Sequence, residues 1–188
     1  MIVAYLRERF PGTFFGPVAL MLAACALGRS ASVVELGIGT IGAAFLLAQF
    51  RIWDDLADRR KDAIAHPQRV LVTAKDPTPL VTLAMALLAI NGVAAVNRDG
   101  TLLSVLLLAL VHAALGGYYL LRNGRTVLGD QLLLAKYPAF IFILAGERLI
   151  SSPLHVALTA SAVYAAASAY EAWHDPISPL AQLLGGRS

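Results

Sequence analysis

The sequence predicts an all-helical integral membrane protein, and three observations support this prediction. Hydrophobic residues make up 58% of the 188 residues and charged residues only 14%, whereas a soluble domain usually carries about 25% charged residues. Long apolar runs recur along the chain, and short polar turns separate them. The runs lack the alternation of apolar and polar residues that a half-buried strand requires. We therefore expect a bundle of about six transmembrane helices.

Each expected span is an apolar run that approaches the length of about 20 residues needed to cross a bilayer. The six runs are Phe14–Leu27, Val33–Trp53, Leu80–Val96, Leu102–Leu121, Leu128–Ala145 and Leu154–Trp173. The first is short, and the fifth contains Asp130 and Lys136. Residues 1–10, which precede the first run, are expected to form a short interfacial lead-in. Turns rich in Gly, Pro, Asn, Asp and Ser separate the runs. They are Gly28-Arg29-Ser30, Asp76-Pro77, Asn97-Arg98-Asp99-Gly100, Arg122-Asn123-Gly124-Arg125 and Ser151-Ser152-Pro153.

No low-complexity linker divides the chain, so residues 1–188 are expected to form a single domain. The isoelectric point is about 9.2, but the basic residues lie in short turns between apolar runs. This arrangement is typical of membrane topology and argues against a nucleic-acid partner. Cys25 is the single cysteine, which excludes a disulfide framework within the chain.

The basic residues are distributed unequally between the two ends of the expected spans. If alternate turns lie on opposite sides of the membrane, one side holds eleven basic residues and the other three. The first set is Arg7, Arg9, Arg51, Arg59, Arg60, Lys61, Arg69, Lys75, Arg122, Arg125 and Arg187, and the second is Arg29, Arg98 and Arg148. The excess predicts that the first side, with the N-terminus, is cytoplasmic in a bacterial-type inner or plasma membrane.

Four aspartates lie within nine residues at the end of the second expected span. Asp54, Asp58 and Asp62 are spaced four apart, which places them on one face of a helix. Like charges at this spacing repel each other, so positive groups are expected among them. Asp55 is displaced by about 100° around the helix, and Arg51 lies four residues before it. A solvated loop with local ion pairs is the alternative explanation for this cluster.

The sixth expected span ends in a second acidic pair. Glu171 and Asp175 are again four apart, and Pro176 ends the helix because the position before a proline disfavours helical geometry. Four spans separate the two acidic clusters, so both are expected on the same side of the membrane. Mg²⁺ prefers oxygen ligands and commonly bridges carboxylates to substrate phosphates. Two facing clusters beside an apolar bundle therefore indicate a substrate with a diphosphate and a hydrocarbon chain.

The two acidic clusters resemble the motifs of the UbiA-type membrane prenyltransferase superfamily. Asp54-xxx-Asp58-xxx-Asp62, followed by His66-Pro67-Gln68-Arg69, is similar to its first motif, which usually reads NxxxDxxxD with an arginine-proline shortly after. Tyr170-Glu171-Ala172-Trp173-His174-Asp175 is similar to its second motif, usually DxxxD. The lead-in Tyr5-Leu6-Arg7-Glu8-Arg9-Phe10-Pro11 is also similar, so the resemblance covers nearly the whole length.

The sequence departs from this family at four points. Asp54 replaces the usual asparagine, Glu171 replaces an aspartate, and Val70 follows Arg69 where proline is usual. The fourth departure is length, since family members usually have nine spans and six are expected here. The single domain would therefore lack the last three helices of the family.

The resemblance implies Mg²⁺-dependent transfer of a prenyl group from an isoprenoid diphosphate to a lipophilic acceptor that the sequence does not identify. The residues expected to carry the reaction are Asp58, Asp62, Glu171 and Asp175, and those expected to bind the metal are Asp54, Asp58, Asp62, Glu171 and Asp175. Arg69 and Asp54 are expected to contact the diphosphate. Lys136 is expected to reach it from inside the bundle, because ionisable groups within a membrane usually face the bundle interior. The alternatives are that Lys136 snorkels to the interface or that the fifth span begins later. Gln49 is expected to line the same cavity.

Three other functions are compatible with the sequence. An intramolecular acceptor would make the chain a UbiA-type terpene cyclase. A protein with the same carboxylates could instead bind prenyl diphosphates without turnover, as an oligomer or as a subunit of a larger complex. A cation transporter would use Asp130 and Lys136 but leaves the paired acidic clusters unexplained, so it ranks last.

Overall fold

The computed structural model describes residues 1–98, 102–122, 124–175, 178–183 and 185. All regular elements within these residues are helices, which confirms the all-helical prediction. They are α1 (Ile2–Arg9), α2 (Gly12–Leu27), α3 (Val33–Ala65), α4 (Val70–Thr73), α5 (Thr78–Arg98), α6 (Leu103–Leu121), α7 (Val127–Leu134), α8 (Lys136–Ala145), α9 (Arg148–Ser151), α10 (Pro153–His174) and α11 (Pro179–Leu183). Parts of the expected turns at 97–100 and 122–125 fall outside the described residues.

The number of helices suited to cross a membrane is smaller than the six expected. Four segments are long and apolar enough: α3, α5, α6, and α7 together with α8. The pair α1 and α2 would add a fifth if it is counted as one span bent by 70°. α10 has 22 residues but is less apolar than these segments, because alanine, serine, threonine and tyrosine replace leucine and valine along most of its length.

Two prolines determine where these helices break. α7 ends at Leu134 and α8 begins two residues later. Pro138 lacks an amide hydrogen, and its ring would clash with the Leu134 carbonyl in a continuous helix. Pro11 separates α1 from α2, since the residue before a proline disfavours helical geometry. Both breaks lie close to the charged end of the bundle.

The main core lies between α2, α3, α6, α8 and α10. Its largest fully buried side chains include Phe50 of α3, Phe140 of α8 and Leu22 of α2. α2 and α3 approach closely at Gly39, where a Cβ atom would lie only 2.8 Å from Leu27 Cδ1. A second apolar cluster joins α1 and α4 to α3 and α5, with the ring of Tyr5 buried within it. This cluster holds α1 beside the end of α3.

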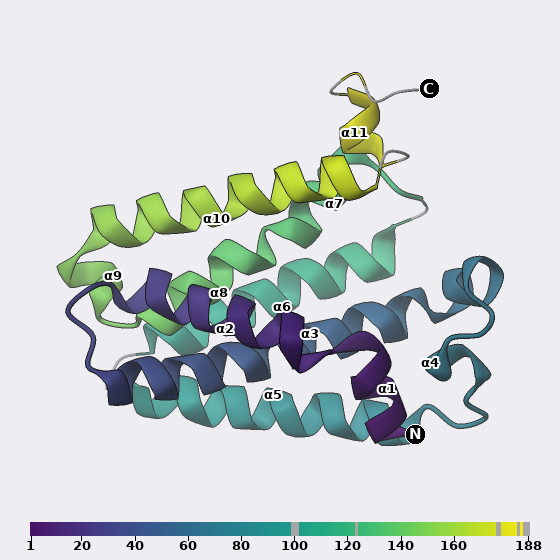
Figure 1. The fold of residues 1–188 in the computed structure, drawn as a ribbon, viewed down its shortest axis with the longest axis horizontal. Helices are drawn as coiled ribbons and strands as arrows, with labels where there is room; N and C mark the ends of the chain where they lie inside the picture. Colours follow the sequence, from purple (N-terminus) through teal and green to yellow (C-terminus); the bar gives the residue numbers. More distant parts are fainter. Residues whose placement is uncertain (99–101, 123, 176–177, 184, 186–188) are drawn as a thin grey trace.

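The helices run roughly along one axis, so the bundle has two distinct ends (Figure 1). The end on the right of Figure 1 holds the N-terminus, α4, α11 and the last turns of α3 and α10. The opposite end holds α9 and the turn between α2 and α3. Because α3 continues to Ala65, the first acidic cluster lies on its last helical turns, at the same end as Glu171 and Asp175.

Candidate functional site

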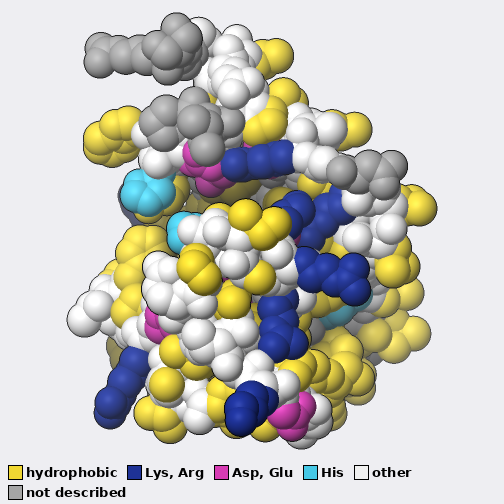
Figure 2. All heavy atoms as spheres, turned by 90° about the vertical axis from the view of Figure 1, so that its right-hand side faces the viewer, with side chains coloured by type: hydrophobic (Ala, Val, Ile, Leu, Met, Phe, Trp, Pro, Cys, Tyr) yellow, Lys and Arg dark blue, Asp and Glu magenta, His cyan; other side chains and the backbone are white. Residues whose placement is uncertain are grey.

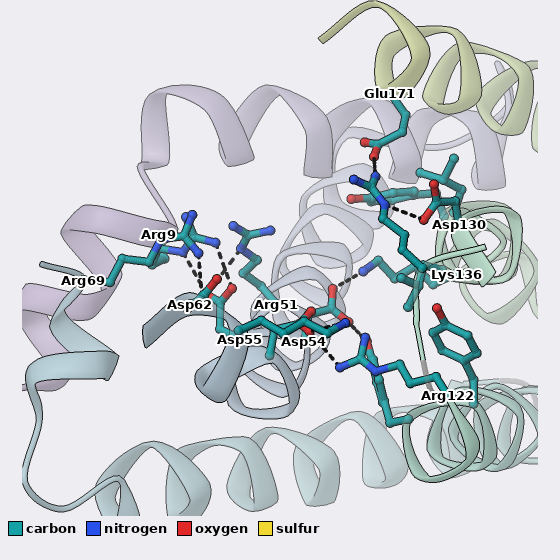
Figure 3. Close-up of a pocket in the computed structure, with 18 residues that line it drawn as sticks. Arg9, Arg51, Asp54, Asp55, Asp62, Arg69, Arg122, Asp130, Lys136 and Glu171 are labelled. Carbon is teal, nitrogen blue, oxygen red and sulfur yellow. Dashed lines mark hydrogen bonds and ion pairs between the residues drawn. The ribbon is translucent and has the colours of Figure 1, made fainter. Parts of the chain in front are cut away.

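A charged cavity of about 380 Å³ opens at the end of the bundle where α3 and α10 finish. Seven basic and six acidic side chains line it, so its charges nearly balance. Figure 2 shows Lys and Arg side chains spread across this end of the molecule, with acidic side chains visible beside some of them. Figure 3 shows the lining side chains pointing toward one another; among them are the aspartates of α3, Lys136 of α8 and Glu171 of α10. The sequence-predicted residues in this lining are Asp54, Asp58, Asp62, Arg69, Lys136 and Glu171.

Asp54 lies at the inner side of the cavity and binds two side chains from other helices. Lys136 Nζ forms an ion pair with Asp54, and the Tyr119 hydroxyl donates a hydrogen bond to the same carboxylate. Only 15% of the Asp54 side chain and 10% of the Lys136 side chain are exposed. Lys136 therefore reaches the cavity from inside the bundle, as its position in the fifth apolar run predicts.

Asp55 is buried and holds α1 against α3. Arg9 donates two hydrogen bonds to its carboxylate, through Nε at 2.9 Å and Nη2 at 2.8 Å. The Tyr5 hydroxyl donates a third at 2.7 Å. Arg51 Nε lies 3.5 Å from Asp55 Oδ2, at the expected spacing of four residues. Asp55 thus anchors the lead-in helix, while Arg9 and Arg51 both line the cavity.

The two outer aspartates of α3 also have basic partners. Arg122 Nη2 lies 2.8 Å from Asp58 Oδ1, and Lys61 Nζ lies 3.3 Å from the same oxygen. Arg69 Nη1 lies 2.5 Å from Asp62 Oδ2. The positive groups expected between like charges are therefore present, and they come from three separate segments of the chain.

Arg125 connects the acidic pair of α10 to α7. Its guanidinium contacts Asp130 at 2.9 Å, Glu171 at 2.6 Å and Asp175 at 2.5 Å. Burial alone would lower the pKa of Arg125, but hydrogen bonds to Asp130 and Asp175 outweigh it, so this pKa stands above its ordinary value. Asp175 is absent from the lining of the cavity but joins it through Arg125. Asp130 and Lys136, six residues apart, have different partners.

The segment between α6 and α7 positions both Arg122 and Arg125. The Thr126 side chain caps α7 by accepting a hydrogen bond from Gly129 N at 3.0 Å. Gly129 lies directly against the phenol of Tyr118, where a Cβ atom would overlap the ring. This close approach brings the start of α7 against the end of α6, so that the two arginines reach opposite sides of the cavity.

Gln49, which the sequence predicts in the cavity lining, is absent from the lining of the charged cavity. It is buried deeper in α3, where Asn91 Nδ2 donates a hydrogen bond to its Oε1 at 2.7 Å. Its Nε2 lies 2.5 Å from His112 Nε2. Gln49 lies more than one helical turn before Asp54, so it points into the joint between α3, α5 and α6 instead.

The arrangement of these carboxylates bears on Mg²⁺ binding. Their oxygens are the ligand type that Mg²⁺ prefers. Within the described residues, no three His, Cys, Asp or Glu side chains gather closely enough to hold a metal ion. Basic side chains occupy the space between the carboxylates. The donor chemistry therefore suits Mg²⁺, but a metal would have to displace a basic side chain to reach more than one carboxylate.

An apolar groove of about 520 Å³ adjoins the charged cavity. Its walls come from α2 and α10 and include Phe14, Phe15, Val18, Met21, Val163, Ala166, Ala167 and Tyr170. The two hollows share five lining residues, which are Arg9, Arg51, Leu134, Tyr137 and Glu171. The charged cavity thus continues directly into an apolar slot along the bundle.

The sequence does not assign Arg122 or Arg125 to this site. Their position predicts only that they belong to a turn that contributes to the charge bias. The repulsion between Asp54, Asp58 and Asp62 indicates that positive groups are needed. It does not indicate which segment supplies them, because the partners are distant in sequence.

Known proteins give no further identification. The chain matches no known protein family, no curated protein and no solved structure. The resemblance to the UbiA-type superfamily thus remains a prediction that depends on the two acidic motifs.

Proposed function

We propose that this chain is a membrane prenyltransferase that moves a prenyl group from an isoprenoid diphosphate to a lipophilic acceptor. The observation that carries the proposal is the direct junction of a charged cavity with an apolar groove. A prenyl diphosphate has the same two parts, a highly charged head and a hydrocarbon tail. The acidic motifs of α3 and α10 contribute to the cavity at this junction, which agrees with the resemblance.

The diphosphate would bind among the basic side chains of the cavity. Arg122, Lys136 and Arg51 line it from three different elements. The Nε of Arg51 makes only a 3.5 Å ion pair with Asp55 and no hydrogen bond within the described residues, so it could donate to a phosphate oxygen. Hydrogen bonds between charged groups are roughly twice as strong as neutral ones. On the other side of the α3 cluster, Arg69 would complete the contacts to the phosphate group.

The prenyl tail would lie in the groove between α2 and α10. The groove wall combines aromatic rings at Phe14 and Phe15 with small residues at Ala166 and Ala167. Burial of apolar surface contributes about 25 cal/mol per Å², so the tail supplies binding free energy away from the reacting bond. This energy would hold the first carbon of the tail near the mouth of the charged cavity.

The reaction requires cleavage of the bond between this carbon and the diphosphate oxygen. The electron pair leaves with the diphosphate, the acceptor supplies an electron pair to the prenyl carbon, and the acceptor then loses a proton to the diphosphate or to water. Lys136 and Arg122 would stabilise the charge that develops on the leaving group. Mg²⁺ would be held by carboxylates of α3 and α10, and when bound it would supply further positive charge to the diphosphate.

Diphosphate release from geranyl, farnesyl and geranylgeranyl diphosphates tests this function. The detergent-solubilised protein would be assayed with Mg²⁺ or EDTA, with and without a crude lipid extract as the acceptor source. We expect Mg²⁺-dependent release that falls about 100-fold in Asp58→Asn and in Arg122→Gln, because each removes a charged group from the cavity. Arg60→Gln is the matched control, since Arg60 is exposed on α3 and absent from the cavity lining.

The outcomes of this assay are distinct. A prenylated product from the lipid extract would establish transfer, whereas a free cyclic hydrocarbon would indicate a terpene cyclase. Substrate binding without release under any condition would contradict the proposal and favour a non-catalytic binding protein or subunit. Release that is equal in Arg122→Gln and Arg60→Gln would exclude the charged cavity as the reaction site.

A further inference from the structure

A second polar pocket lies at the end of the bundle opposite the charged cavity. It has a volume of about 460 Å³, and it lies between the turn that joins α2 to α3 and the segment formed by α9 and the start of α10. Figure 1 shows both segments at the left-hand end of the bundle. None of the described residues that line this pocket is acidic, whereas the charges of the first cavity nearly balance. The polar residues of its lining are Arg29, Ser30, Arg148, Ser151, Ser152 and His155.

Arg148 is held in place by the end of α2. Its Nη1 donates a hydrogen bond to the Leu27 carbonyl, which is one of the helix-end carbonyls that lack a partner within the helix. Its Nη2 lies 3.1 Å from Glu35 Oε1. A guanidinium has more N–H donors than these two contacts use, and 27% of the Arg148 side chain is exposed. Arg148 therefore keeps donors for a further acceptor, in an orientation that the fold already sets.

His155 is oriented by the same helix end. Its Nε2 lies 3.1 Å from the Cys25 carbonyl oxygen, and because a carbonyl only accepts, Nε2 carries the hydrogen. Thr159 Oγ1 donates to the same carbonyl oxygen at 3.1 Å. Gly28 has a φ of +70°, and a Cβ atom there would lie only 3.1 Å from His155 Nε2. The glycine thus lets the chain turn close against the imidazole, which leaves Nδ1 able to accept a hydrogen bond from a hydroxyl.

The pocket has a net positive charge. Arg29 is exposed and forms no ion pair within the described part of the chain. Arg29 and Arg148 together with the paired Glu35 give a net formal charge of +1. Glu147 precedes Arg148 but is exposed and does not line the pocket. The start of α10 adds to the positive potential, because Ser152 makes no side-chain cap and the first amides of a helix lack partners within it.

Exposed apolar side chains lie next to the pocket in the sequence. Ile150 directly precedes Ser151, and Leu154 directly precedes His155. In a membrane such side chains would contact acyl chains, so a ligand with a charged head and apolar tails suits the pocket and its surroundings together. The exposed apolar residues of this set are Val33, Val34, Ile150, Leu154 and Leu158, with exposed fractions from 61% to 87%.

We propose that this pocket binds the phosphodiester headgroup of an anionic phospholipid. Arg29 and Arg148 would contact the phosphate oxygens, since a basic pocket between membrane helices suits such a headgroup. The hydroxyls of Ser151 and Ser152, with His155 Nδ1, would bind a hydroxyl-bearing headgroup such as glycerol. A zwitterionic headgroup would instead bring a positive charge beside the two arginines. The lipid would join the turn before α3 to α9 and α10, and so stabilise this end of the bundle.

The lipid site is independent of the proposed function. It shares no lining residue with the charged cavity or with the apolar groove. Loss of prenyl transfer would therefore leave the lipid site standing, and loss of lipid binding would leave the transfer reaction untouched.

Native mass spectrometry of the detergent-solubilised protein tests the lipid site. The probes are dioleoyl phosphatidylglycerol and dioleoyl phosphatidylcholine, which carry the same acyl chains. We expect the anionic lipid to bind about tenfold more tightly. Arg29→Gln should weaken its binding about fivefold, because each basic residue near an anionic headgroup contributes attraction of that order. Ser151→Glu should weaken it about tenfold, because it places a negative charge in the pocket.

Arg60→Gln is the matched control, since it removes an exposed arginine outside the lining of this pocket. Arg29 makes no ion pair within the described residues, so Arg29→Gln should fold as wild type does. Thermal unfolding provides a second readout, because a ligand that binds only the folded protein raises the unfolding temperature. Phosphatidylglycerol should raise it in wild type and in Arg60→Gln, and much less in Arg29→Gln.

Three results would overturn the proposal. One is equal binding of the two lipids by wild type. Another is an equal effect of Arg29→Gln and Arg60→Gln on phosphatidylglycerol binding. The third is displacement of phosphatidylglycerol by an equal concentration of glycerol 3-phosphate, which would identify the ligand as a soluble phosphate. Preference for the anionic lipid that persists against glycerol 3-phosphate and is lost in Arg29→Gln and Ser151→Glu would establish the lipid site.

Discussion

At the scale of single residues, the ion pair between Asp54 and Lys136 is one of the most buried contacts of the site. Both side chains are largely buried, and they come from α3 and α8. Removal of one member of a buried pair leaves the other charge without compensation, which typically costs 3–5 kcal/mol. Removal of both members avoids this penalty. The pair therefore specifies how α8 is placed against α3 more than it adds net stability.

We expect Asp54→Asn and Lys136→Met each to reduce the free energy of unfolding by about 3 kcal/mol. The double variant should lose less than the sum of the two, because neither charge is then left alone. Unfolding of the detergent-solubilised protein, followed by circular dichroism, would measure all three. Asp58→Asn is a suitable comparison, since its side chain is 32% exposed and its loss should cost about 1 kcal/mol or less. Strictly additive losses would contradict direct coupling.

The same residues show how far the sequence determines the site. The spacing of Asp54, Asp58 and Asp62 predicts one helix face, and the polar position of Lys136 in an apolar run predicts that it faces inward. Both predictions agree with the structure. The partnership of Asp54 with Lys136, 82 residues away, is not encoded in local spacing. It arises from the packing of α8 on α3, which periodicity alone does not determine.

At the scale of elements, the contact between α6 and α7 shapes the outer wall of the cavity. Gly129 has no room for a side chain because the Tyr118 phenol lies against it. A phenol ring is rigid and cannot yield in the way that the end of a flexible chain can. Any substituent at Gly129 would therefore displace the Tyr118 ring or push α7, with Arg125 and Asp130, away from α6.

We expect Gly129→Ala to destabilise the protein by about 1–3 kcal/mol, as overpacking usually does. Gly117→Ala in α6 is the matched control, since a Cβ atom there meets nothing within 4 Å. Alanine is favoured over glycine inside a helix, so that variant should be as stable as wild type or more stable. Equal thermal unfolding of the two variants would refute the close packing at Gly129.

The sequence predicts the positions of the helices better than the contacts between them. The apolar runs locate the long helices, because an apolar run long enough to cross a bilayer adopts few structures other than a helix. The break at Ala135 could have been anticipated from Pro138, since proline disrupts the preceding helical turn. The role of α1 could not have been anticipated in the same way. Tyr5 and Arg9 hold α1 in place through hydrogen bonds to Asp55, which lies 46 residues beyond Arg9. Local patterns predict the interfacial character of α1 but not its contact with α3.

At the scale of the whole molecule, the charged residues are concentrated at one end of the bundle. The charge bias in the sequence counts basic residues in turns, yet most basic residues at this end form ion pairs with carboxylates. Acidic residues contribute little to the rule that relates basic loops to the cytoplasm. The predicted orientation is therefore compatible with the ion pairs. The position of α10 is also open to test, because it is less apolar than the other long helices.

Cysteine labelling from the two sides of the membrane would determine the orientation of the chain and whether α10 spans the membrane. In a Cys25→Ala background, we expect Arg60→Cys and Trp173→Cys to react from the same side, because both lie at the charged end. Arg29→Cys and Ser152→Cys should react from the other side, and all four positions are exposed. If α10 lies along the membrane surface, Ser152→Cys and Trp173→Cys would instead react from one side. If α10 spans the membrane, the groove between α2 and α10 lies within the bilayer, where a prenyl chain can enter it laterally from the lipid.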